Sequence, residues 1–270
     1  MGLKYIYAGF SKTGTKTIAE VFRTLNFVVH DYEETALYNV DNWLKFLNPE
    51  TGRAEKIKIL RDTFENVDVV TDAPHFFFWE ELMEAFPEAK CIIWKRNSAS
   101  WFKSFKNQTE SSLDLVSVFG KRIHPKIAEA FVLPFSFMFC PTLYKISTMG
   151  VYVQTLINGY SATTPAVHLS EIDCIRNYNQ HVNYLIAKLG ATDKLLVLNE
   201  INCGWQVICD FCKVPVPVGI DWPHKNKNAK INDELFASDS ALSKKMKKEM
   251  MMRLSFIPVI LLLVLVGISL

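Results

Sequence analysis

The feature that most constrains this chain of 270 residues is a strand, a glycine-containing loop and a helix near its start. The apolar run over residues 3–8 predicts a buried strand, and Ile18, Val21 and Phe22 have the spacing of an amphipathic helix. The loop between them carries glycines, hydroxyl groups and lysines. Such side chains bind anionic groups together with the free N–H groups at a helix start. We therefore expect a phosphate-binding loop over residues 9–17.

This loop is an imperfect match to the motif that binds nucleoside triphosphates, G-x-x-x-x-G-K-[ST]. Gly9 and Gly14 have the right spacing, but Thr15 separates the second glycine from Lys16 and Thr17. One inserted residue turns a helix-borne lysine by about 100° around the helix axis, because a turn holds about 3.6 residues. The loop is therefore weak evidence for an ATP-binding enzyme.

Predicted strands and helices alternate along the rest of the first 226 residues. Further apolar strands are expected over residues 27–30, 67–72, 90–97 and 194–199. Helical spacing is found between them, over residues 43–47, 53–65, 75–86, 98–105, 169–189 and 204–211. This alternation predicts an α/β domain over residues 1–226, built on a mainly parallel sheet.

Several separated motifs resemble those of sulfotransferases. The K-T-G-T run at residues 12–15 resembles the family's K-[ST]-G-T-T loop for 5′-phosphosulfate, with Lys16 in place of the last Thr. Residues 94–104 are similar to V-R-[DN]-P-x-x-W-x-x-S, and residues 195–217 to a C-terminal G-W and V-P-V-P pattern. The resemblance implies a three-layer fold like that of P-loop nucleotide hydrolases. It also implies sulfuryl transfer from 3′-phosphoadenosine 5′-phosphosulfate (PAPS) to a hydroxyl or amine.

The resemblance assigns roles to individual residues. Lys12 would stabilise charge on the bridging oxygen as the S–O bond breaks. Asp72 occupies the place of the histidine base of K-T-H-L-P, although an aspartate is a weaker base; His75 is a second candidate. The alternative interpretation of Asp72 is a helix N-cap. The donor-binding set is Lys12, Thr13, Gly14, Thr15, Lys16 and Thr17 for the phosphosulfate, and Arg96 with Ser104 for the 3′-phosphate.

Charge and cysteine content bear on partners and metals. The formal net charge of +2 gives no electrostatic reason to expect a nucleic-acid partner. Cys209 and Cys212 form an isolated CxxC pair without a second ligand pair at zinc spacing. We therefore expect no metal. The acceptor that we expect is a small molecule or a lipid. The apolar segment 131–140 is a candidate wall for the acceptor pocket.

The C-terminal tail, residues 227–270, differs in composition from the predicted domain before it. Residues 227–253 are polar and basic, which predicts a linker or a marginal helix. Residues 254–270 carry no charge, and 13 of these 17 residues are Leu, Ile, Val or Phe. As a helix they would span about 25 Å, close to the thinner bilayer of the endoplasmic reticulum. Lysines before this stretch predict a single-pass C-terminal membrane anchor with the catalytic domain in the cytosol.

Three functions are open from the sequence. The first is a PAPS-dependent sulfotransferase that acts at a membrane surface. The second is an ATP- or GTP-dependent kinase or ATPase, with Asp72 as its magnesium ligand. The third is a non-catalytic, nucleotide-binding membrane adaptor. The anchor and the apolar segment favour a lipophilic hydroxyl as the acceptor.

Overall fold

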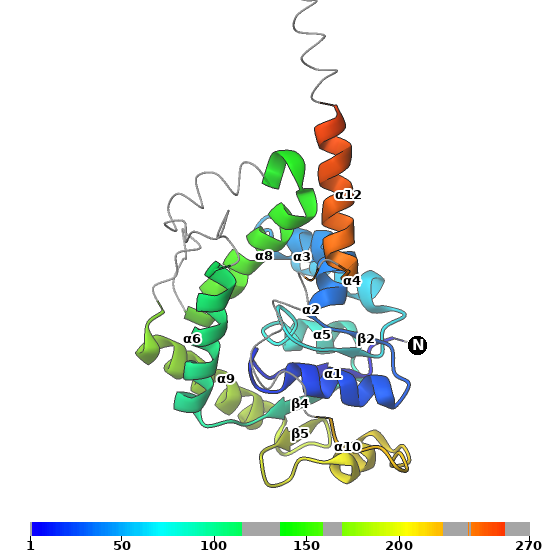
Figure 1. Ribbon diagram of the computed structural model, residues 1–270. Helices are drawn as coiled ribbons and strands as arrows, with labels where there is room; N and C mark the ends of the chain where they lie inside the picture. Colours follow the sequence, from blue (N-terminus) through cyan, green and yellow to red (C-terminus); the bar gives the residue numbers. More distant parts are fainter. Residues whose placement is uncertain (1, 115–135, 159–168, 224–236, 238, 257–270) are drawn as a thin grey trace, which may run out of the picture.

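The computed structural model describes residues 2–114, 136–158, 169–223, 237 and 239–256 (Figure 1). Within these residues a five-stranded sheet has the order β2-β3-β1-β4-β5, and each neighbouring pair is parallel. The strands are β1 (Tyr5–Tyr7), β2 (Val29–His30), β3 (Val69–Val70), β4 (Lys90–Trp94) and β5 (Leu195–Leu198). The predicted α/β fold with a parallel sheet is confirmed.

Helices cover both faces of the sheet. α1 (Thr15–Thr24) and α10 (Trp205–Cys212) pack on the face toward which Tyr5 and Tyr7 of β1 point. Ile6 lies between these two residues and points to the opposite face, as the two-residue period of a strand requires. The helices on that face are α3 (Val40–Leu47), α4 (Arg53–Phe64), α5 (Trp79–Ala85), α6 (Ser98–Asp114), α8 (Pro141–Asn158) and α9 (Glu171–Leu189).

Two short elements connect β2 to α3. α2 (Tyr32–Glu34) is a single turn whose N-terminus is capped by the side chain of Asp31. A π-helix, η1 (Thr35–Asn39), follows it directly. π-Helical turns are rare and are often found at functional sites.

The chain after β3 differs from the prediction. The helix expected from residue 75 begins at Trp79, and the preceding residues form turns. The N–H of Phe77 donates to the carbonyl of Pro74, and that of Phe78 donates to the carbonyl of His75. These bonds span three residues, whereas an α-helix needs four. The tighter turns bury Phe76 and His75 under the sheet edge.

The predicted linker contains a helix that packs against the domain, α12 (Ala241–Ser255). Leu242 near its start is fully buried in the core that contains α3 and α8. The carboxylate of Glu249 accepts hydrogen bonds from the backbone N–H and the hydroxyl of Thr142, at 2.9 and 2.6 Å. The sequence predicted a linker or a marginal helix here, because a lysine-rich composition gives no sign of these two contacts.

The predicted membrane anchor, residues 254–270, lies outside the described residues from 257 onward. Among the helices that the structure describes, none has the length and apolarity needed to cross a membrane. The anchor therefore stays a prediction. Most of the apolar segment 131–140 also lies outside the described residues; of its described part, Phe137 and Met138 are exposed.

If α12 is part of the folded domain, shortening its buried leucine must destabilise the whole domain. We expect Leu242→Ala to lower the free energy of unfolding by about 2–5 kcal/mol, the range for a buried leucine. Urea denaturation monitored by tryptophan fluorescence measures this loss. The exposed Met251→Ala serves as a control and should change stability by less than about 0.5 kcal/mol. Equal stability of both variants would mean that α12 is only loosely attached.

Candidate active site

The carboxyl ends of four neighbouring strands meet at one edge of the sheet. The glycine-containing loop follows β1, and Asp31 directly follows β2. Asp72 and Arg96 each lie two residues beyond the last residue of β3 and β4. In open α/β sheets, ligands bind in the crevice at this edge. The fold thus brings the loop, Asp72 and Arg96 together, although they are far apart in the sequence.

Side chains from outside the loop hold its peptide carbonyls. Three of them each donate to one carbonyl oxygen: His181 Nε2 to Ala8 (2.7 Å), Trp101 Nε1 to Ser11 (2.9 Å) and Arg96 Nη1 to Lys12 (2.9 Å). Within the loop, the carbonyl of Phe10 accepts from the N–H and hydroxyl of Thr13. The Thr13 carbonyl accepts from the hydroxyl of Tyr7 at 2.5 Å. Hydrogen bonds to its carbonyl oxygens therefore fix the conformation of the loop backbone.

The N-terminus of α1 is open to an anion. Gly14 is its N-cap residue, and within the described structure no side chain caps this end and no acidic residue occupies the first turn. The first N–H groups of a helix have no acceptor within the helix, so they can bind an anion. Gly14 has a φ of +96°, and a Cβ there would lie 3.2 Å from the indole of Trp94. Both facts favour glycine at this position.

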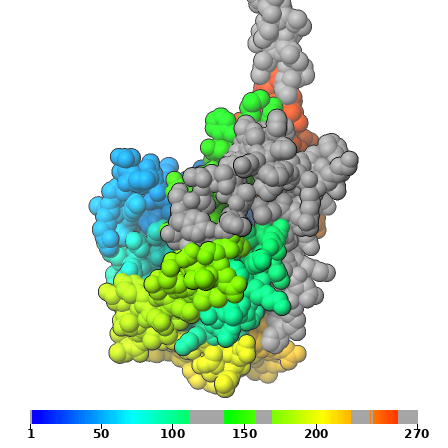
Figure 2. Space-filling view, turned by 90° about the vertical axis from the view of Figure 1, so that its left-hand side faces the viewer, coloured from blue at the N-terminus to red at the C-terminus, as the bar shows by residue number. Residues whose placement is uncertain are grey.

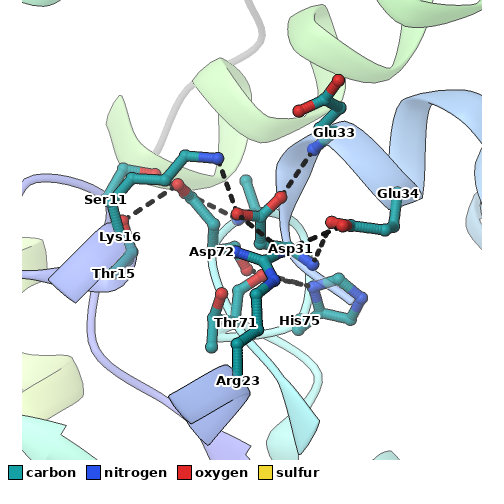
Figure 3. A network of polar contacts seen from close by, with 11 residues as sticks. Ser11, Thr15, Lys16, Arg23, Asp31, Glu33, Glu34, Thr71, Asp72 and His75 are labelled. Carbon is teal, nitrogen blue, oxygen red and sulfur yellow. Dashed lines mark hydrogen bonds and ion pairs between the residues drawn. The ribbon is translucent and has the colours of Figure 1, made fainter. Parts of the chain in front are cut away.

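Asp72 connects β3 to the loop. Its carboxylate accepts hydrogen bonds from the hydroxyls of Ser11 (2.5 Å) and Thr15 (3.0 Å) and from the N–H of Ala73 (2.8 Å) (Figure 3). It is not the N-cap of the next helix, because α5 begins at Trp79 with Phe78 as its N-cap residue. The N-cap interpretation of Asp72 is therefore wrong.

Lys12 lies in the field of Asp72 and Arg96. Its backbone has a φ of 72°, a left-handed conformation that is uncommon outside glycine. Burial lowers the pKa of the Lys12 ammonium, the charge of Asp72 raises it, and the charge of Arg96 lowers it further. An ammonium group that has lost part of its hydration gains more from an anionic ligand than a fully solvated one.

Lys16 is held by a different carboxylate. Its Nζ lies 2.6 Å from Oδ2 of Asp31, and Asp31 is buried (Figure 3). The guanidinium of Arg23 lies 3.5 Å from the same carboxylate and 2.8 Å from that of Glu34. Burial by itself would raise the pKa of Asp31, but its contact with Glu34 and the charges of Lys16 and Arg23 hold this pKa well below the ordinary value.

Arg96 links the loop to α6. One guanidinium nitrogen donates to the Lys12 carbonyl, and the other donates to the hydroxyl of Ser100 at 3.0 Å. The hydroxyl of Tyr178 holds the backbone of Arg96 through its N–H (2.9 Å) and its carbonyl (3.1 Å). The predicted partner Ser104 lies one turn beyond Ser100 and is half-buried. Residues four apart on a helix share a face, so both hydroxyls lie on one face of α6.

Three other predicted site residues are buried. The hydroxyl of Thr13 is turned toward Phe10 and Tyr7, and Thr17 is buried on α1. His75 is fully buried, with Nδ1 donating to the carbonyls of Thr71 (3.0 Å) and Asp72 (3.2 Å). Burial lowers the pKa of His75 to about 4.

The His75 imidazole packs at right angles against the indole of Trp43 and on the ring of Phe64, which are core residues. The structure therefore places the His75 imidazole in the core, where it contacts the backbone of Asp72 but not its carboxylate.

Residues of the site that were missed from the sequence include Ser11, Ser100 and Asp31. Ser11 precedes the predicted lysine, and Ser100 lies four residues before the predicted serine, so each lies beside a recognised position. Asp31 follows a predicted strand, and a carboxylate at a strand end was the signal that could have identified it. No group of three or more metal-binding side chains lies together among the residues that the structure describes.

The depressed pKa of Asp31 predicts a pH-dependent contribution to stability. We expect Asp31→Asn to cost about 3 kcal/mol at pH 7, because it leaves Lys16 without its buried partner. A carboxylate with a lowered pKa stabilises the folded state above its unfolded-state pKa of about 3.9, and this contribution is lost as the pH falls toward the lower folded-state value. The difference between variant and wild type should therefore shrink below about pH 4.

Urea unfolding at a series of pH values measures this difference. Asp41→Asn provides the matched control, since Asp41 forms an exposed ion pair with Lys145. Surface pairs contribute only about 0–1 kcal/mol. A loss for Asp31→Asn that is independent of pH would contradict the electrostatic explanation.

Comparison with known proteins found a family profile that matches most of the chain. The family profile described as "Sulfotransferase domain" matches residues 4–231. "Ava biosynthesis cluster protein M" from Aspergillus versicolor is 25% identical over 228 residues, covering 82% of this chain and 80% of the relative. A sulfotransferase structure from Alicyclobacillus acidocaldarius aligns with 92% of this chain and 95% of its own, at 13% identity and a TM-score of 0.39. Because the profile covers most of the sequence, the chain belongs to the sulfotransferase domain family.

Proposed function

We propose that this protein transfers a sulfuryl group from PAPS to a hydroxyl or amine of an acceptor at a membrane surface. The observation that carries the proposal is the bond between Arg96 Nη1 and the Lys12 carbonyl, 2.9 Å long. It joins two basic, anion-binding elements that leave β1 and β4 side by side. PAPS carries anionic groups at both its 5′ and its 3′ positions, which fits two such elements.

The loop provides for the 5′-phosphosulfate. The carbonyls of residues 8 and 10–13 are bonded to donors of the protein, and the N–H of Thr13 is one of these donors. We assign the other N–H groups of the loop and the N-terminus of α1 to the ligand. When the S–O bond breaks, charge accumulates on the bridging oxygen of the leaving phosphate. The ammonium of Lys12 is the group that we assign to this charge, where it acts more strongly in the transition state than in the ground state.

Arg96 and α6 provide for the 3′-phosphate. A guanidinium presents several N–H donors in one plane, which suits a phosphate better than a hydroxyl. We assign the 3′-phosphate to Arg96 with Ser104, as the sequence predicted, and add Ser100. In this assignment the bond from Arg96 to the Ser100 hydroxyl keeps the guanidinium at the end of β4 until the donor binds.

Asp72 is the base that we assign to the acceptor. The hydroxyls of Ser11 and Thr15 and the N–H of Ala73 orient its carboxylate beside the loop. A carboxylate held in this way can accept the proton that the acceptor oxygen or nitrogen loses as it attacks sulfur. His75 has no part in this assignment, because its imidazole is packed into the core.

The kinase or ATPase alternative depends on Lys16. In that interpretation the ammonium of Lys16 binds the terminal phosphates. In the structure this ammonium is paired with buried Asp31 at 2.6 Å, so nucleotide binding would have to break this ion pair and leave the buried carboxylate with only its longer, 3.5 Å contact to Arg23. Breaking such a pair costs about 3–5 kcal/mol. This observation favours PAPS over ATP as the ligand of the loop.

Binding of the product nucleotide tests the donor assignment. We expect 3′-phosphoadenosine 5′-phosphate to raise the melting temperature more than ATP with Mg²⁺ does, because it should bind more tightly. A ligand present at a hundred times its Kd stabilises the folded state by about 2.7 kcal/mol. Arg96→Met should weaken binding of 3′-phosphoadenosine 5′-phosphate roughly ten- to hundredfold, because hydrogen bonds to a charged group are lost. It should weaken binding of adenosine 5′-phosphate less, because that ligand loses only the support that Arg96 gives to the Lys12 carbonyl. The neighbouring exposed Lys95→Met is the control. Protection by ATP–Mg²⁺ alone would refute the assignment.

Turnover tests the catalytic roles. With labelled PAPS and a panel of lipophilic and water-soluble alcohols and amines, we expect Lys12→Ala to lower kcat by about 10²–10³. Asp72→Asn should lower it by about 10²–10⁴ and change its pH dependence, because the base is lost. Lys58→Ala, on an exposed position of α4, should have no effect. Tight donor binding without turnover on any acceptor would favour the non-catalytic adaptor, and product on water-soluble acceptors only would refute the membrane-surface acceptor.

A further inference from the structure

The far end of α12 carries a group of exposed apolar side chains. Every residue from 251 to 256 is exposed, although four of these six are Met, Leu or Phe. The Arg253 guanidinium donates to the Met138 carbonyl at 2.8 Å, which places a second exposed apolar segment beside the helix. We call these residues the apolar tip: Phe137 (64% exposed), Met138 (58%), Met251 (64%), Met252 (52%), Leu254 (39%) and Phe256 (60%).

The apolar tip projects from the domain. Figure 1 shows α12 extending away from the sheet beyond the start of α8, and Figure 2 shows its red end beside the green segment that precedes α8. Contiguous apolar surface on a soluble domain marks an interaction site more often than single exposed residues do. A helix end that is apolar on most of its sides has no single stripe that a flat protein surface could cover.

The helix is held firmly at its other end. Leu242 is buried in the core, and Lys245 Nζ donates to the carbonyl of Leu37 in η1 at 2.9 Å. Midway along α12, Glu249 binds the N–H and hydroxyl of Thr142 at the N-terminus of α8. These contacts fix the direction in which the apolar tip points relative to the sheet.

Charge and chain continuity indicate the partner. Basic side chains lie along the part of α12 that leads to the apolar tip, since this helix exposes Lys244, Lys248 and Arg253. Basic groups next to exposed apolar side chains are typical of elements that lie in the headgroup region of a bilayer. The chain continues from the tip into residues 257–270, which carry no charge. The length and apolarity of this remaining chain suit lipid and not a water-exposed partner.

We propose that the apolar tip is a lipid-contacting surface: Phe137, Met138 and the end of α12 enter the headgroup region of a bilayer. α12 then acts as a rigid strut that sets the orientation of the sulfotransferase domain on the membrane. The surface shares Leu254 and Phe256 with the predicted anchor, but it also includes two residues of α12 before the anchor and two of the segment before α8. The proposal does not depend on sulfuryl transfer.

The strut also lies close to the candidate site. Lys245 binds η1, and η1 follows directly after α2, which Asp31 caps. Asp31 in turn holds Lys16 of α1. The lipid-contacting helix and the donor loop are thus separated by two short elements. This arrangement keeps the edge of the sheet that carries the site at a fixed position relative to the bilayer, where a lipophilic acceptor is concentrated.

A polarity-sensitive fluorophore on the full chain tests the proposal. Cys203 is the one cysteine of the six that is not buried, so a Cys203→Ser background permits labelling at a single introduced cysteine. The probe is attached in Met138→Cys, at the apolar tip, or in the control Ile201→Cys, in the exposed turn between β5 and α10. Vesicles of phosphatidylcholine with phosphatidylserine are then added, with and without a lipid-borne quencher.

We expect a blue shift and quenching at position 138 and neither at position 201. Lys248→Gln should weaken binding to these vesicles about fivefold and leave binding to pure phosphatidylcholine unchanged, since one basic residue near an anionic surface contributes about 1 kcal/mol. A probe at position 138 that stays in water while the protein sediments with vesicles would overturn the proposal. A shift without vesicles that grows with protein concentration would also overturn it, because the tip would then bind a second copy of the chain.

Discussion

The site depends on the hydrogen bonds that hold the carbonyl oxygens of the loop after β1. Donors come from β1, from the end of β4, from α6 and from α9, so four elements agree on one loop conformation. A buried carbonyl without a donor costs about 1–3 kcal/mol, so a loop turned the other way would leave several of these groups unsatisfied. The conformation of the loop is thereby set by the protein itself, which is the kind of preorganisation that the proposed reaction would need.

Two carboxylates at neighbouring strand ends each interact with a different lysine of the loop. Asp31 pairs with Lys16, while Asp72 lies in the field of Lys12 and binds the hydroxyls of Ser11 and Thr15. This division explains the position at which the loop departs from the family pattern. Lys16, which replaces the last Thr of the family pattern, adds no net positive charge to the loop, because it is paired with the buried carboxylate of Asp31.

The sequence was sufficient for features that depend on local patterns. β1, α1 and the basic residues beyond β4 follow from apolar periodicity and from glycines that a loop requires. Arg96 was assigned to the 3′-phosphate of the donor through the resemblance to sulfotransferases, and its position after a predicted parallel strand predicts that it lies at the same edge of the sheet as the loop. Sequence patterns could not tell Ser100 from Ser104 as its partner, since both lie on one face of α6 and the rotamer of a single arginine decides between them.

Other features depend on long-range packing and were beyond sequence patterns. The hydrophobic spacing after β3 fits a helix from residue 75, but the tight turns that follow Asp72 delay the helix and bury His75. For α12, the lysine-rich pattern is typical of a solvated segment, and only the partners of Leu242 and Glu249 decide otherwise. The elements that α12 packs against, α8 and η1, lie about a hundred residues or more away in the sequence, and no local rule links such distant positions.

The π-helix η1 is where the site and α12 meet. A π-helical turn is wider than an α-helical one and is less stable by itself, so it persists where neighbours hold it. Asp31 caps the turn before η1, and Lys245 binds a carbonyl within it. η1 therefore lies between α2, whose cap residue Asp31 pairs with Lys16 of the loop, and α12, which carries the apolar tip.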